Sequence, residues 1–163
     1  MNSELDAHLA AVQKAQVPMQ QESEQRCHER AVFPDRFLAT ADSMLRSVFD
    51  STAETLHKYG FGATVELVRE QPGSDPNSFP YIVLHFSPHP CPLSDLGYIY
   101  TLAGASVSLI CRRDDLCVEA VVAHPAGHGV ERRVNFYTLS LEDLTSERVT
   151  RIVTDAVKQI IRW

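Results

Sequence analysis

Histidine and cysteine are the side chains in this chain whose types could support metal chemistry. His85, His89 and Cys91 lie within seven residues, and His124 and His128 lie within five. Imidazole and thiolate groups are suitable zinc ligands. However, none of these spacings matches paired Cys-x-x-Cys knuckles, and histidine is also tolerated in loops. These five residues are therefore a candidate metal site, beside the simpler interpretation that they are loop residues.

Catalytic and cofactor motifs are weak. Cys91 could act as a nucleophile with a nearby histidine as base, but no Gly-x-Ser-x-Gly elbow is present. The pairs Asp114-Asp115 and Glu142-Asp143 are explained by a turn and by the start of a helix. Gly60-Phe61-Gly62 lacks the further glycine and the lysine of a nucleotide loop. The sequence therefore names no catalytic residue and no cofactor, and an enzyme is the alternative hypothesis.

Composition limits the class of partner and the location. The chain has 163 residues and a formal net charge of −6, which argues against nucleic acid because phosphate contacts need clustered Lys and Arg. No apolar run reaches the roughly 18–20 residues of a membrane span. The four cysteines are sparse and unpatterned. A cytoplasmic protein without a disulfide framework is expected.

Two amphipathic helix patterns bracket a run of strand patterns. The first covers 33–59, with Pro34 in its first turn and Gly60 as its cap. The second runs from Thr145, a plausible N-cap, to Trp163. The apolar stripe of the first comprises Phe33, Phe37, Ala41, Met44, Leu45, Val48, Thr52, Leu56 and Tyr59.

Residues 1–32 form a polar segment with a different composition. Leu5, Leu9 and Val12 give a weak helical stripe, which Pro18 is expected to end or kink. Residues 19–30 are rich in Gln and Glu and could be a solvated helix or a loosely held arm. The sequence therefore predicts a polar helical arm over 1–32 and a single domain over 33–163.

Five strands are predicted at 63–70, 81–87, 98–111, 116–123 and 130–139, with a bulge at Gly104 in the third. If Asp114-Asp115 is a two-residue turn, Cys111 faces Val118 and Leu109 faces Ala120 on one face of the sheet. Cys117 then points the other way, opposite Arg112, so a Cys111–Cys117 disulfide is rejected.

Short links between these strands favour an antiparallel meander, since parallel pairing needs long crossovers. The predicted fold is therefore a two-layer α+β domain. In this fold a five-stranded antiparallel meander sheet has the long N-terminal-side helix and the C-terminal helix packed on one face.

The second face of this sheet has no helix to cover it. Its candidate binding residues are Tyr81, Val83, His85, Val121 and Tyr137, and all of these except His85 are more apolar than a solvated face requires. Three interpretations remain open. The N-terminal segment could fold across this face, another protein or a second copy could bind there, or β propensity alone could explain these residues.

These observations favour a non-enzymatic protein-binding module of the adaptor or chaperone type. Its partner would be another protein or a second copy of the chain, with neither nucleic acid nor membrane involved. The alternative is a small enzyme or a ligand- or metal-binding protein that uses the His/Cys loops at 85–91 and 124–128.

Overall fold

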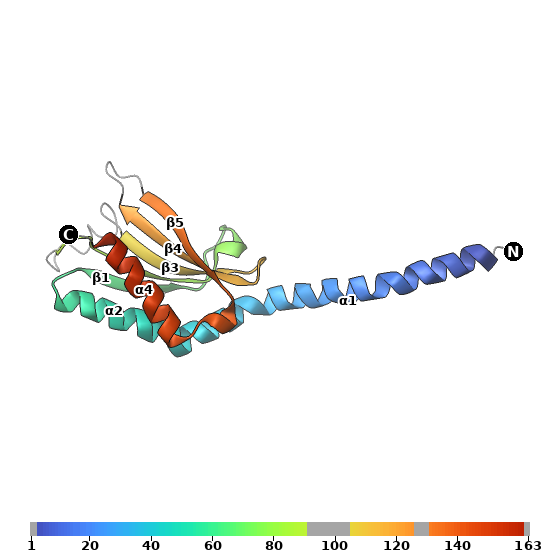
Figure 1. The fold of residues 1–163 in the computed structure, drawn as a ribbon, viewed down its shortest axis with the longest axis horizontal. Helices are drawn as coiled ribbons and strands as arrows, with labels where there is room; N and C mark the ends of the chain where they lie inside the picture. The colour runs from blue at the N-terminus through green and yellow to red at the C-terminus, as the bar shows by residue number, and fades with distance from the viewer. Residues whose placement is uncertain (1–2, 91–104, 126–130, 162–163) are drawn as a thin grey trace.

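A computed structural model describes residues 3–90, 105–125 and 131–161 of the chain (Figure 1). The elements in chain order are α1 (Ser3–Thr40), η1 (Ala41–Leu45), α2 (Arg46–Lys58), β1 (Ala63–Val68), η2 (Pro76–Ser78), β2 (Tyr81–Phe86), β3 (Ala105–Arg112), β4 (Cys117–Pro125), β5 (Glu131–Leu139), η5 (Leu141–Asp143) and α4 (Ser146–Ile160).

The N-terminal part of the chain is one uninterrupted helix. The 38 residues of α1 pass directly into the five of η1 and the 13 of α2, because Thr40 and Leu45 keep helical backbone angles. Of the two alternatives for Pro18, a helix end or a kink, the helix end is therefore wrong, and so is the prediction that the long helix begins at Pro34. Each proline removes one N–H donor, and the surrounding Ala-, Gln- and Glu-rich sequence retains high helix propensity.

A π-helical turn, η1, adjusts the apolar stripe of this helix. The core side chains Phe33, Phe37, Ala41, Leu45 and Phe49 recur every four residues. In a regular α-helix that spacing rotates the stripe by about 40° at each step, and the wider π turn reverses part of this drift. The sequence pattern therefore missed Phe49 and Ala53, which are buried. It wrongly included Tyr59, which is 70% exposed.

The sheet is a meander in the order β1-β2-β3-β4-β5, with every neighbouring pair antiparallel. The derived register of the β3–β4 hairpin is confirmed: Cys111 pairs with Val118, Leu109 with Ala120 and Arg112 with Cys117. Both cysteines are free, as expected. The predicted bulge at Gly104 and the first part of the predicted third strand lie outside the described residues.

The predicted two-layer α+β architecture is confirmed. Helices α2 and α4 lie on the same side of the sheet (Figure 1) and bury one apolar core against it. The largest fully buried side chains of this core are Phe37, Phe49, Phe86, Leu45, Ile82, Leu84, Leu109, Val107, Val118, Val122 and Val149. Thr145 is the N-cap of α4, as predicted, because its side chain accepts a hydrogen bond from the Arg148 N–H at 3.2 Å.

The first part of α1 projects away from this domain (Figure 1). Every residue from Ser3 to His28 is exposed, and Phe33 is the first buried residue of the helix. We call residues 3–32 the arm. The interpretation in which the N-terminal segment folds across the sheet is therefore wrong, because the arm continues the helix axis away from the domain.

Candidate functional site

The face of the sheet opposite the helices, here called the open face, brings together four of the five residues proposed for binding. The register aligns His85 with Ser106, Val83 with Ser108 and Tyr81 with Ile110. Ser108 in turn faces Val121 across β3 and β4. Tyr81, Val83, His85 and Val121 therefore share one surface, because alternate residues of a strand point to the same face.

These residues line a hollow of about 300 Å³ on the open face. Its lining comprises Ser78, Phe79, Tyr81, Val83, His85, Ser106, Ser108, Ile110, Arg112, Val121 and Ala123. Val83 and Ala123 are only 4% and 3% exposed, so the deepest part of the hollow is apolar. The hydroxyl groups of Ser106 and Ser108 and the imidazole of His85 add polar groups. This combination of an apolar floor and few polar groups is typical of a small binding site.

One wall of the hollow is held by Arg112. Its guanidinium pairs with the Glu119 carboxylate and donates hydrogen bonds to the Asn77 carbonyl and the Ser78 hydroxyl, both at 3.3 Å. The Asn77 side chain also accepts a hydrogen bond from the Asp114 N–H at 2.9 Å. The connection between β1 and β2 is therefore fastened to the β3–β4 hairpin.

Tyr137 lies on the opposite face from the other four residues. Ala120 pairs with Tyr137 but Val121 pairs with Asn135, so β5 carries an extra residue at this point. A bulge of this kind shifts the pairing by one residue and reverses the face to which the later residues of the strand point. The assignment of Tyr137 to the open face is therefore wrong, because sequence parity does not reveal the bulge.

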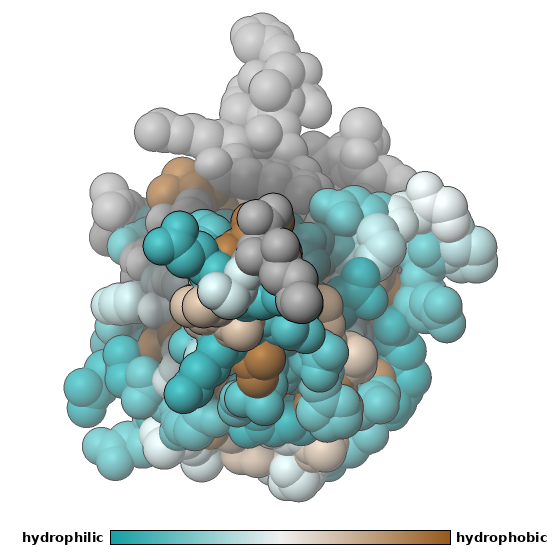
Figure 2. All heavy atoms as spheres, turned by 90° about the vertical axis from the view of Figure 1, so that its right-hand side faces the viewer, coloured by the Kyte–Doolittle hydropathy of each residue, from teal (hydrophilic) through white to brown (hydrophobic). Residues whose placement is uncertain are grey.

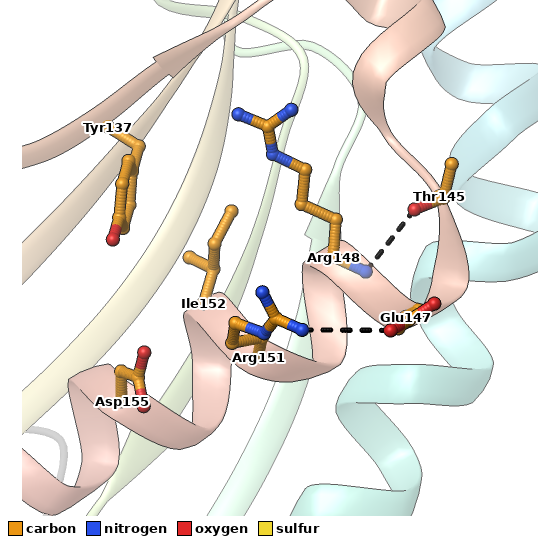
Figure 3. Close-up of a pocket in the computed structure, with 7 residues that line it drawn as sticks. All are labelled: Tyr137, Thr145, Glu147, Arg148, Arg151, Ile152 and Asp155. Atoms are coloured by element: carbon orange, nitrogen blue, oxygen red, sulfur yellow. Dashed lines mark hydrogen bonds and ion pairs between the residues drawn. The ribbon is translucent and has the colours of Figure 1, made fainter.

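Tyr137 instead lines a pocket of about 370 Å³ between β5 and α4 (Figure 3). Ile152 lies beside it on α4, and the guanidinium groups of Arg148 and Arg151 flank the opening. Arg151 pairs with Glu147 at 3.6 Å and Arg148 lies 3.9 Å from Asp143. Since each arginine has a carboxylate partner, the pocket has no strong net charge that would select an anion.

The candidate metal residues do not form one cluster. By register, His85 lies on the open face, whereas His124 has the parity of the buried Val122 on the helix-covered face. His89 is exposed beyond the end of β2. Cys91 and His128 lie outside the described residues. Within 3–90, 105–125 and 131–161, no three His, Cys, Asp or Glu side chains are placed to hold one ion.

The cysteines on β3 and β4 are poorly suited to nucleophilic chemistry. Burial raises the pKa of the Cys111 thiol to about 12. The pKa of Cys117 is also raised, first by burial and then by the nearby Asp115 and Glu119 carboxylates. The thiolate is the reactive form, so both side chains remain protonated thiols near neutral pH.

One feature of the surface was missed at the level of sequence. Ser106, Ser108 and Arg112 line the hollow, and strand parity could have placed them there, since they alternate with buried residues of β3. The helical arm itself was expected from its polar composition. Viewed along the arm, hydrophilic side chains dominate the visible surface with hydrophobic ones scattered among them (Figure 2).

The arm nevertheless exposes large apolar side chains. Leu5, Leu9, Val12, Val17 and Met19 have exposed fractions between 38% and 71%. Within the described ranges, none of the helices combines the length and apolar content that crossing a lipid bilayer requires.

A comparison with known proteins finds no matching family model, no similar curated protein and no similar solved structure.

Proposed function

We propose that this chain is a protein-binding module whose principal recognition element is the arm. The observation that carries this proposal is that 26 successive helical residues, Ser3 to His28, are all exposed. Most of the stability of a helix in a protein comes from packing an apolar face, and these residues pack against nothing in the part of the chain that the structure describes. A partner that covers the arm would supply that packing.

Pro18 strengthens this argument. It lies inside α1, where it removes one backbone hydrogen bond and costs about 3 kcal/mol relative to alanine. Neither the sheet nor α4 contacts this part of the helix to offset that cost, since all residues around Pro18 are exposed. A helix that lacks this hydrogen bond gains more from a partner than a regular helix does.

Photo-crosslinking inside the producing cell tests the proposal. A photoreactive phenylalanine analogue replaces Leu9 in the full chain, and the control carries it at the exposed Glu54 of α2. We expect a protein adduct at position 9 and none at position 54. The adduct's mass distinguishes a second copy from a different protein. Absence of any adduct at positions 5, 9, 12 and 19 would refute the proposed function.

The hollow on the open face supports a second candidate function, binding of a small ligand. Its volume of about 300 Å³ matches the lower end of ligand pockets, and His85, Ser106 and Ser108 offer polar contacts around an apolar floor. Native mass spectrometry of the full chain tests this. A bound mass that disappears in a Val83→Phe variant, which fills the floor, would favour the ligand; an unliganded chain would favour the arm.

A further inference from the structure

We propose that β5 pairs with the β5 of a second copy, antiparallel and around a two-fold axis, so that the two sheets join edge to edge. This inference goes beyond the proposed function, because it does not depend on the arm. It is carried by the outer edge of β5, by the position of the bulge in this strand and by two exposed apolar side chains.

β5 is the last strand in the sheet order and forms one edge of the sheet (Figure 1). Among the described residues its backbone pairs with β4 alone, and no turn or loop backbone bonds to its outer side. Every second residue of an edge strand turns its N–H and C=O groups outward. These groups form a template for another extended strand.

The opposite edge of the sheet, at β1, is tied to the helices instead. The Nε2 atom of His57 on α2 lies 2.7 Å from the Ala63 carbonyl oxygen, to which it donates. Arg69, directly after β1, pairs with Asp42 of η1 at 2.7 Å. A helix that covers a sheet edge protects it from strand addition. We therefore expect a second strand at β5 and not at β1.

The bulge in β5 identifies the second strand. Val121 pairs with Asn135 and Ala120 with Tyr137, so Phe136 is the extra residue. A regular strand beside β5 would have to skip one residue at this point to keep its side chains on the correct faces. A second β5 has its own extra residue, so the two strands pair residue for residue when both bulges lie at the two-fold axis.

One antiparallel register places the two bulges opposite one another. In this register Val134 of each copy faces Tyr137 of the other, and Asn135 faces Phe136. Val134 and Tyr137 both lie on the helix-covered face, because they pair with buried residues of β4. A shift of one residue would set Val134 against Thr138, which follows Tyr137 and lies on the other face.

The two residues that face one another in this register are apolar and exposed. Val134 is 38% exposed and Tyr137 is 42% exposed. Of the large apolar side chains described outside the arm, Tyr59 is the only other exposed one. Because a two-fold interface contains each contact twice, the pairing covers both residues in both copies.

The charges of β5 are compatible with this register. Glu131, Arg132 and Arg133 lie at the start of the strand. The register sets them against the uncharged residues 138–140 of the other copy, so no like charges lie directly opposite one another. The pocket beside Tyr137 is lined by two arginines and two carboxylates. It therefore does not repel the start of the second strand.

Sedimentation velocity of the full chain over a concentration series tests the pairing. We expect a reversible dimer whose dissociation constant rises by about tenfold or more in Tyr137→Lys, because the added charge enters the apolar contact twice. Tyr59→Lys is the matched control at the 70% exposed end of α2, and it should change the constant by less than about twofold. Thermal unfolding establishes that both variants fold.

A monomer at all concentrations, or equal effects of the two variants, would overturn the inference. A dimer lost in Leu9→Lys but kept in Tyr137→Lys would place the contact on the arm. That result would overturn this inference alone and leave the proposed function standing.

Disulfide formation tests the register and does not require Tyr137→Lys to fold. Val134→Cys and Tyr137→Cys are prepared separately with the exposed Cys27 replaced by Ser, and each is oxidised alone and in a mixture. The mixture should form a linked dimer, since the two positions face each other. Either variant alone should not, because its two thiols lie three residues, about 10 Å, apart along the strands. No linked dimer in the mixture, or equal linking in the single variants, would contradict the register.

Discussion

Arg112 and Glu119 form an ion pair between β3 and β4, and the same guanidinium holds the Asn77 carbonyl and the Ser78 hydroxyl. Both side chains are largely shielded, with 26% and 19% exposed. We expect Arg112→Met to lower the free energy of unfolding by about 1–3 kcal/mol, because it leaves the Glu119 carboxylate partly buried without its partner. Urea denaturation measures this. Arg151→Met, at an exposed pair, is the control and should change little.

Ser87 and Gly62 form a reciprocal pair of hydrogen bonds at the start of β1 and the end of β2. The Gly62 N–H donates to the Ser87 hydroxyl at 3.0 Å, and the Ser87 N–H donates to the Gly62 carbonyl at 2.9 Å. Ser87→Ala should cost about 1–3 kcal/mol, since it leaves a buried N–H without an acceptor. Thermal and urea unfolding check this. An equal loss for the exposed Ser43→Ala would contradict the assignment.

Cys111 should make the fold sensitive to alkaline pH. Burial raises the pKa of its thiol from 9.0 to about 12 in the folded chain. A raised folded pKa gives stability that is full below the unfolded value and is lost as pH rises through the window between 9 and 12. The loss approaches about 1.4 kcal/mol per pH unit within that window. Unfolding of the wild type and of Cys111→Ala at pH 8, 9 and 10.5 measures it. The stability advantage of the wild type should shrink as pH rises; a constant difference would count against this origin.

Pro18→Ala should strengthen the arm. Alanine restores the missing backbone hydrogen bond, and the helix gains about 3 kcal/mol locally. Hydrogen exchange of the arm amides in the full chain should slow. Faster or unchanged exchange would mean that Pro18 already occupies a position without helical cost.

Val121→Lys tests whether the partner binds at the open face or at the arm. Val121 lies on β4 in the lining of the hollow and is only partly buried. If partner binding depends on the arm, the yield of the crosslinked adduct at position 9 stays within about twofold of the wild type in this variant. Quantitative blotting of the adduct provides the measurement. Loss of the adduct in Val121→Lys would assign the partner contact to the open face.

The parts of the fold that could be predicted are those where one face is strongly apolar. The alternation on β3 and β4 determined the pairing of Cys111 with Val118, because a one-residue slip would expose the core side chains. The helix cap at Thr145 could be predicted for a similar reason, since its hydroxyl satisfies a free N–H of the first turn.

The parts that could not be predicted involve a single inserted residue or a tolerated proline. The bulge in β5 placed Tyr137 on the helix-covered face, and the π turn brought Phe49 into the core. Neither irregularity has a periodic signature in the sequence. Pro18 and Pro34 each lack only one donor, so the helix could continue through both, contrary to their usual meaning as helix ends.

The helix passes from the arm through η1 into α2 without a break in its helical backbone. Because Phe33 and Phe37 are buried in the core, they set the direction in which the helix leaves the domain. At 1.5 Å per residue, the arm over residues 3–32 extends about 45 Å from Phe33. A partner bound near Leu5 would therefore be held about 45 Å from the point at which the helix enters the core.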